Sequence, residues 1–256
     1  MRQIWILAQN TIKALIRKKD FYVFFIMLLV LLVSLLSENF FGARNVSRYI
    51  KDIGFFCLWL FSFIIAVTFA SKQLPEEIDS KTILPLLAKP VTRTHFILGR
   101  FLGTVLASSS AYTIFYFLYI VVTSIKGEGI AFSLVIQAYI MGICFLSLVS
   151  AISILLTLYL TLSAGITVSF VIYFAIIWFA DKLRAIVISR TGIESVLLNI
   201  VYYVIPHYEF YDLRVRLAHS WEAFPLWVLS GVIVYTILYT SVVLYISCSK
   251  LKKKFL

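Results

Sequence analysis

Long runs of apolar residues, separated by short charged segments, form the dominant pattern of this chain. Runs without any charged residue cover 21–37, 53–71, 101–125, 129–180 and 223–249. About 20 apolar helical residues cross the roughly 30 Å of bilayer hydrocarbon, because a helix rises about 1.5 Å per residue. The run 129–180 is long enough for two such helices, which we expect to be joined by a tight turn near 161–165. The pattern therefore predicts six membrane-spanning helices.

The composition agrees with this pattern. Of the 256 residues, 62% are hydrophobic and 14% are charged, and the mean hydropathy is +0.98. Soluble domains are about 45–50% apolar and about 25% charged. A soluble domain of this size could not bury so much apolar surface. We therefore predict an all-α polytopic membrane protein.

Residues 1–20 show a helical period with two distinct faces. The apolar face comprises Ile4, Leu7, Ala8, Ile12, Leu15 and Ile16, and the polar face comprises Arg2, Gln9, Lys13 and Arg17. This pattern predicts an amphipathic helix on the cytoplasmic membrane surface, with Arg17, Lys18 and Lys19 anchored at the lipid headgroups. A signal peptide is the alternative interpretation. We expect the segment to be retained, because no small-residue cleavage site follows Leu36.

Charge sets the expected orientation. The net charge is +11, from 23 Lys and Arg against 12 Asp and Glu, and much of the excess lies in the two short tails. Lys and Arg concentrate in cytoplasmic segments, so both termini are expected in the cytoplasm of a multi-pass cell-membrane protein. A basic chain can also bind nucleic acid. Beside such long apolar runs, contact with anionic lipid is the better interpretation, and no nucleic-acid partner is expected.

The segment 181–222 precedes the last span and is expected on the outer side. Within it, 193–205 is apolar enough to enter lipid but too short to cross it, and Pro206 ends the run. We predict a re-entrant or interfacial helical segment at this position.

By these boundaries no span contains Asp, Glu, Lys, Arg or His. Ionisable groups at membrane depth mark proton relays and ion sites, so this pattern disfavours ion-coupled transport and intramembrane hydrolysis. The chain has no GxxxxGK[ST] motif that would hold ATP. Its three cysteines, Cys57, Cys144 and Cys248, form no metal or disulfide pattern. We therefore predict no catalytic residue, no cofactor and no metal, and any energy for transport must come from another polypeptide.

Small residues recur every four positions in the third span, at Gly99, Gly103, Ala107 and Ala111. Such a series allows helices to approach closely. A second series continues through the fourth and fifth spans, at Ser153, Thr157, Thr161, Gly165 and Ser169. We expect both to pack helices inside the subunit, with a dimer or substrate surface as the alternative. The tyrosine stripe Tyr112, Tyr116 and Tyr119 is likewise expected in the bundle core.

The cytoplasmic loop 72–95 is more patterned than a simple connection. Pro75 can open a helix at its first position, and Glu76, Glu77 and Asp79 would lie in a first turn that favours anions. Apolar Ile78, Leu84, Leu86 and Leu87 follow, and Pro90 stops the helix. The pattern predicts a short amphipathic helix at the membrane face. Arg93 and Arg100 are expected beyond it, as anchors at the headgroup boundary.

Two stretches of this region carry a resemblance to a known family. They are Leu-Leu-Ala-Lys-Pro-Val-Thr-Arg at 86–93 and Leu-Gly-Arg-Phe-Leu-Gly at 98–103, after the acidic residues and Lys81-Thr82. Together they resemble the loop between the second and third spans of type 2 ABC-transporter permeases. The resemblance implies a permease domain over 21–256 that pairs with an ATP-binding cassette ATPase subunit and with a second permease copy or paralogue. It also implies a coupling helix at 76–87 that docks on the ATPase through Glu76, Glu77, Asp79, Lys81, Thr82, Leu86 and Leu87.

Two hypotheses follow. The first is a non-catalytic permease subunit that exports a hydrophobic or amphipathic substrate. The second is a polytopic membrane enzyme or lipid-modifying protein with its chemistry in 181–222, where the available polar side chains are His207, Glu209, Asp212, Arg214 and His219. A stand-alone channel is disfavoured because no ring of charges or filter sequence is present.

Overall fold

The computed structural model describes residues 2–16, 22–23, 26–27, 29–30, 46–79, 93–126, 130–189, 199, 202 and 204–254. Over these residues the chain is helical and contains no strand. The elements are α1 (Arg2–Ile16), α3 (Val46–Asp79), α5 (Arg93–Lys126), α6 (Phe132–Tyr159), α7 (Leu162–Ser189), the 3₁₀ turn η1 (Tyr208–Tyr211), α9 (Arg214–Ala218) and α10 (Leu226–Lys254).

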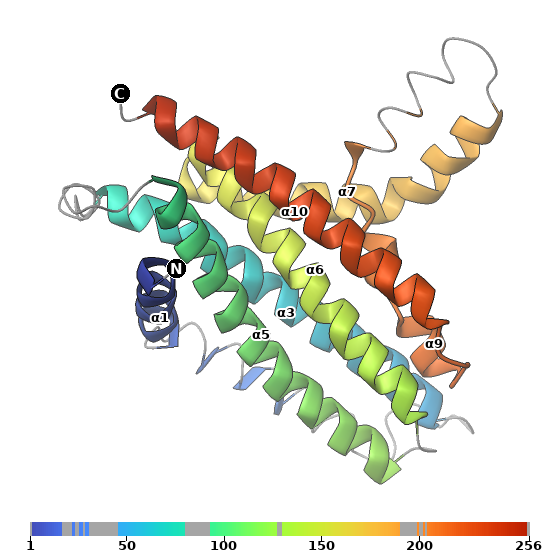
Figure 1. Ribbon diagram of the computed structural model, residues 1–256. Coiled ribbons are helices and arrows are strands. Elements are labelled where there is room, and N and C mark those ends of the chain that lie inside the picture. The colour runs from blue at the N-terminus through green and yellow to red at the C-terminus, as the bar shows by residue number, and fades with distance from the viewer. Residues whose placement is uncertain are drawn as a thin grey trace.

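Helices α3, α5, α6 and α10 run side by side as a bundle, and α7 crosses it at an angle (Figure 1). One end of the bundle carries α1, the last turns of α3, the first turns of α5 and the connection between α6 and α7 (Figure 1). The other end carries α9 and the first turns of α3, α6 and α10. We call these the α1 end and the α9 end.

Five described helices are long and apolar enough to cross a membrane, which confirms an all-helical, multi-pass membrane protein. These spans are Ile50–Pro75, Thr94–Ile125, Phe132–Tyr159, Leu162–Phe179 and Leu226–Leu251. The predicted first span, 21–37, lies largely outside the described residues. Its described pairs, 22–23, 26–27 and 29–30, are helical and exposed.

The helices differ strongly in how much of each span is buried. The buried share is 72% for α3 and 61% for α6, against 28% for α10 and 22% for α7. Helices α3 and α6 therefore form the centre of the bundle. The exposed faces of α7 and α10 carry large apolar side chains, such as Trp178 and Trp227, each 74% exposed. Such faces suit contact with lipid.

The expected division of 129–180 into two helices is confirmed. The turn lies at Leu160 and Thr161, and the remainder of the predicted 161–165 stretch forms the first turn of α7. The hairpin packs through small residues: the hydroxyls of Ser153 and Ser169 lie 3.3 Å apart. A Cβ on Gly165 would lie 3.0 Å from Cγ2 of Thr157. Small side chains thus allow α6 and α7 to fold back directly on each other.

The prediction that Pro75 opens a separate helix is wrong, because α3 continues through Pro75 to Asp79. A proline inside a helix removes one backbone hydrogen bond and costs about 3 kcal/mol. Burial of the neighbouring side chain offsets that cost, since Leu74 is fully buried in a cluster with Phe96 and Ile97 of α5. The second span and the first turn of the expected coupling helix are therefore one continuous helix.

Candidate functional site

The α1 end holds a close contact between α1 and α5. Gly103 of α5 faces Thr11 of α1, and a Cβ on Gly103 would lie 2.5 Å from Cβ of Thr11 and 3.0 Å from the carbonyl oxygen of Ala8. Leu7, Ala8 and Thr11 are all buried. The absence of a side chain on Gly103 therefore lets the amphipathic helix lie directly against the helix that follows the 72–95 loop.

A polar contact fixes the same junction. Nη1 of Arg100 donates a hydrogen bond to Oγ1 of Thr11 at 2.7 Å, and Thr11 in turn donates to the carbonyl oxygen of Leu7 at 3.0 Å. The guanidinium of Arg100 also lies 5.5 Å from the centre of the Phe96 ring. Arg100, predicted as an anchor at the headgroup boundary, is only 8% exposed in the structure and bonds to α1. The signal that sequence reasoning missed is Thr11, a hydroxyl on the otherwise apolar face of α1.

The other small residues of the α5 series are also buried. Gly99 is buried near the start of α5, and Ala107 and Ala111 lie in the main core at 1% and 0% exposure. Gly103 thus contacts α1, while the two alanines face the interior of the bundle. The series packs helices within this chain, along the third predicted span.

The predicted ATPase-docking residues fall at the edge of what the structure describes. The backbones of Glu76, Glu77 and Asp79 form the final turn of α3, at the α1 end, and Arg93 is the first residue of α5. The side chains of these four residues lie outside the described part. The same holds for the remaining predicted docking residues, Lys81, Thr82, Leu86 and Leu87. It also holds for the predicted anchors Arg17, Lys18 and Lys19.

The described part of 202–211 packs between α7 and α10. The carbonyl oxygen of Val204 accepts a hydrogen bond from the Tyr239 hydroxyl at 2.9 Å. The backbone N–H of His207 donates to the Tyr235 hydroxyl at 3.1 Å, and the hydroxyls of Tyr211 and Thr236 lie 2.8 Å apart. Polar backbone in a bilayer needs such partners, so side chains of α10 stabilise the irregular backbone at 205–207 and the 3₁₀ turn that follows it.

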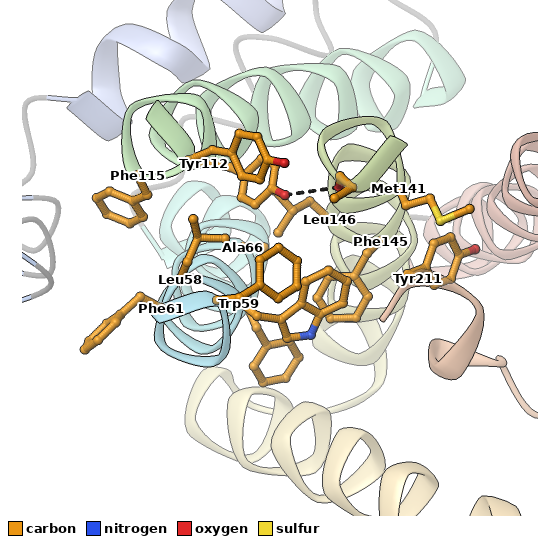
Figure 2. Packing of buried hydrophobic residues seen from close by; sticks show 14 of the residues in the cluster. Leu58, Trp59, Phe61, Ala66, Tyr112, Phe115, Met141, Phe145, Leu146 and Tyr211 are labelled. Atoms are coloured by element: carbon orange, nitrogen blue, oxygen red, sulfur yellow. Dashed lines mark hydrogen bonds between the residues drawn. The ribbon is translucent and has the colours of Figure 1, made fainter. Parts of the chain in front are cut away.

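This segment meets the central aromatic cluster. The rings of Tyr208 and Tyr211 lie 5.6 and 6.1 Å from that of Phe145 on α6. Phe145 also stacks on Trp59 of α3 at 4.2 Å, as the close view of the core illustrates (Figure 2). Nε1 of Trp59 donates to the Tyr173 hydroxyl of α7 at 3.0 Å. Helices α3, α6 and α7 are thus held together beside η1.

A mainly apolar cavity of about 290 Å³ lies between α7 and this segment. Its lining comprises Ile172, Ala175, Ile176, Phe179, Tyr202, Ile205, Pro206 and His207. His207 is only 6% exposed, and burial lowers the pKa of its imidazole. The ring is therefore neutral at pH 7, so it has one hydrogen-bond donor and one acceptor.

The α9 end contains a second cluster of polar residues. Lys51 is only 3% exposed, and its Nζ donates to Oγ of Ser220 at 3.0 Å. Asp52 pairs with Arg214 at 3.3 Å. These contacts join the first turns of α3 to α9 and to the turn that follows it. The candidate spans of α3 and α5 are longer than the predicted runs 53–71 and 101–125, and they include Lys51, Asp52 and Arg100 near their ends.

The polar residues expected to support chemistry in 181–222 do not converge. His207 lines the cavity beside α7, whereas the side chain of Asp212 accepts a hydrogen bond from the backbone of Arg214 at 2.8 Å. The His219 ring lies beside the carbonyl oxygen of Val215 and the ring of Trp221. Within the described ranges, no three His, Cys, Asp or Glu residues are grouped closely enough to hold a metal ion.

Neither a protein-family model nor a curated protein matches this chain.

Proposed function

We propose that the chain is the membrane-spanning permease subunit of an ATP-binding cassette transporter and is driven by a separate ATPase subunit. The observation that carries this proposal is the junction of α1 with the first turns of α5. The amphipathic helix packs on α5 directly after the 72–95 loop, through Gly103 and the Arg100–Thr11 hydrogen bond. That loop contains the stretches that resemble the coupling segment of type 2 permeases.

Force from an ATPase on this loop would reach the bundle through two stiff elements. The loop joins α3, which extends to Asp79, with α5, which begins at Arg93. Both helices continue across the bundle and share the apolar cluster around Leu74 and Phe96 at the α1 end. A push on Glu76 or Glu77 would therefore move α3 and α5 together. The chain itself is non-catalytic in this proposal, and ATP hydrolysis takes place in the partner.

The proposed substrate is hydrophobic or amphipathic and is exported. The large apolar side chains on the outer faces of α7 and α10 would allow entry from the bilayer. Both termini lie in the cytoplasm of a cell-membrane protein in this proposal. Because the number of crossings must then be even, 21–37 has to be a sixth span. The proposal also requires 193–205 to re-enter without crossing. The contact of Val204 with Tyr239, near the middle of the Leu226–Leu251 span, supports the re-entrant course.

The test reverses the charges of the two glutamates that are proposed to contact the ATPase. The double variant Glu76→Lys with Glu77→Lys is co-expressed with the candidate ATPase subunit, purified in detergent and reconstituted, and its substrate-stimulated ATPase activity is measured. We expect the stimulation to be lost while insertion and thermal stability persist. The matched control is Glu222→Lys, an exposed glutamate at the α9 end, which should retain full stimulation.

Equal activity of the double variant and the control would overturn the docking role. Failure of any ATPase subunit to co-purify with the wild-type chain would overturn the transporter proposal as a whole. The alternative of an enzyme in 181–222 lacks support from geometry, because His207, Asp212 and His219 serve three separate local contacts.

A further inference from the structure

Helices α6 and α10 form an apolar groove on the outside of the bundle. Its lining comprises Leu155 of α6, Val204, and Tyr235, Leu238, Tyr239, Val242, Val243 and Ile246 of α10. The groove has a volume of about 450 Å³, within the range of roughly 300–1,000 Å³ that is typical of ligand pockets. Leu238, Val242 and Ile246 are exposed within the Leu226–Leu251 span, so the groove opens toward the bilayer.

The groove has the length of a single leaflet. It begins at Tyr235, near the middle of the α10 span, and follows α10 to Ile246, toward the α1 end (Figure 1). Between these residues the helix rises about 16 Å, and one leaflet holds about half of the roughly 30 Å of bilayer hydrocarbon. The hydroxyls of Tyr235 and Tyr239 are already bonded to backbone groups of His207 and Val204. The groove therefore offers hydrocarbon contact, which suits one acyl chain.

A positive charge lies one helical turn beyond the groove. Lys250 follows the lining residue Ile246 by four positions on α10, and Tyr159 follows the lining residue Leu155 by four positions on α6. Residues four apart share a helix face, so both walls of the groove continue to this pair. Nζ of Lys250 lies 4.3 Å from the centre of the Tyr159 ring. The ring thus holds the ammonium at the end of the α10 span, where lipid headgroups lie.

No carboxylate on the two helices of the groove neutralises this ammonium. The sequences of α6 and α10 contain neither Asp nor Glu. Lys250 is partly exposed and, within the part of the chain that the structure describes, makes no ion pair. Basic sites between membrane-spanning helices are suited to anionic headgroups. A lipid phosphate at this level would therefore meet an opposite charge directly above a slot for its acyl chain.

We propose that the groove between α6 and α10 binds one anionic phospholipid from the leaflet at the α1 end. One acyl chain lies along Leu238, Val242 and Ile246, and the phosphate pairs with the ammonium of Lys250. The other acyl chain stays in the surrounding bilayer. The site goes beyond the transport role proposed above, since it needs neither the ATPase nor a second permease copy.

The site can be tested on the full chain in phosphatidylcholine nanodiscs, without any ATPase. A small fraction of the lipid is replaced by a probe, either phosphatidylglycerol or phosphatidylcholine, that carries a diazirine on one acyl chain. The photolabelled peptides are identified by mass spectrometry. We expect the phosphatidylglycerol probe to label the peptides that contain 155 and 235–246 about tenfold more than the phosphatidylcholine probe does.

Two variants, each with a matched control, separate the two parts of the site. Lys250→Gln removes the charge, so labelling by phosphatidylglycerol should fall to the level of phosphatidylcholine. Lys13→Gln removes the same charge from an exposed position on α1, at the same end, and should leave the preference unchanged. Val242→Trp fills the groove and should reduce its labelling by both probes. Val234→Trp adds the same side chain at an exposed position of α10 outside the groove and should leave the labelling unchanged.

Three results would overturn the proposal. Equal labelling of the groove by the two probes would show that the headgroup charge is not recognised. An equal fall for Lys250→Gln and Lys13→Gln would show that net positive charge at this end, and not the groove, attracts the lipid. Labelling that survives Val242→Trp would show that the probe merely dissolves in the bilayer around α10. Since no ATPase is present, none of these results bears on the transporter proposal.

Discussion

One glycine on α6 determines how closely α5 and α6 approach. A Cβ on Gly142 would overlap the phenol group of Tyr112. Tyr112 cannot turn aside easily, because it is 1% exposed and its hydroxyl donates to the carbonyl oxygen of Ala138 at 3.3 Å (Figure 2). Its ring also stacks on Tyr139, with centroids 5.8 Å apart. The space at Gly142 is therefore required by the packing of Tyr112.

We expect Gly142→Ala to lower the free energy of unfolding by about 1–3 kcal/mol, as overpacking of a core does. This loss should appear although alanine favours a helix by about 1 kcal/mol over glycine. The control is Gly231→Ala on α10, where a Cβ would meet nothing within 4 Å and stability should rise slightly. The measurement is the thermal unfolding midpoint in detergent. A rise in both variants would contradict the account.

For single residues, the sequence predicts burial of a side chain better than it predicts the hydrogen-bond partner of that side chain. Intervals of four and three residues place Tyr112, Tyr116 and Tyr119 on one face, and all three are buried, at no more than 4% exposure. Their hydroxyls, however, donate to backbone carbonyls of Ala138, Val135 and Lys51. Every residue carries such a carbonyl, so no sequence pattern marks these acceptors.

Among the elements, α1 depends most on a few side chains. Thr11 is fully buried and connects Arg100 of α5 to the carbonyl oxygen of Leu7 in its own helix. Valine has nearly the same shape as threonine but cannot accept a hydrogen bond. The variant Thr11→Val therefore removes a bond to a charged group, and such bonds contribute about 1.5–3 kcal/mol.

We expect Thr11→Val to loosen α1 while the bundle stays folded. The measurement is the rate of tryptic cleavage after Lys13, which is exposed on α1, and this rate should increase. Thr167→Val provides the control, because Thr167 is exposed on α7 and its hydroxyl donates to the carbonyl oxygen of Ser163 in the same helix. If both variants are cleaved at the wild-type rate, the Arg100–Thr11 bond does not hold α1.

The elements also show where local signals mislead. Pro75 followed by acidic residues is a typical helix start, yet α3 runs through it because Leu74 packs against α5. Tertiary burial overrode the local preference. By contrast, the turn at Leu160 and Thr161 follows from length alone, since 129–180 exceeds what one crossing can hold. The number of helices is thus predictable from the lengths of the apolar runs, whereas the residues at which helices begin and end depend on contacts between helices.

For the whole molecule, the sequence could not reveal the cavity beside α7. Pro206 and His207 read as loop residues that follow a short apolar run. Only the packing of α7 and α10 on both sides brings His207 beside Tyr235 and opposite Ile176. Long-range packing of this kind leaves no periodic pattern in the sequence, because His207 and Tyr235 are 28 positions apart and belong to different elements.

The distribution of elements between the α1 end and the α9 end leads to the last prediction. The α6–α7 turn lies at the α1 end, and the first turn of α6 lies at the α9 end (Figure 1). If Lys and Arg set the orientation, the α1 end faces the cytoplasm. Single cysteines at two exposed positions, Ser133→Cys and Thr161→Cys, should then react from opposite sides of the membrane.

The labelling uses a membrane-impermeant maleimide on intact cells, in a chain whose three native cysteines are replaced by serine or alanine. We expect Ser133→Cys to react before permeabilisation and Thr161→Cys to react only afterwards. The reverse pattern would invert the orientation and place the 72–95 loop outside, where no cytosolic ATPase could reach it. Labelling of both positions from one side would mean that α6 does not cross the bilayer, and the bundle would then need a different membrane arrangement.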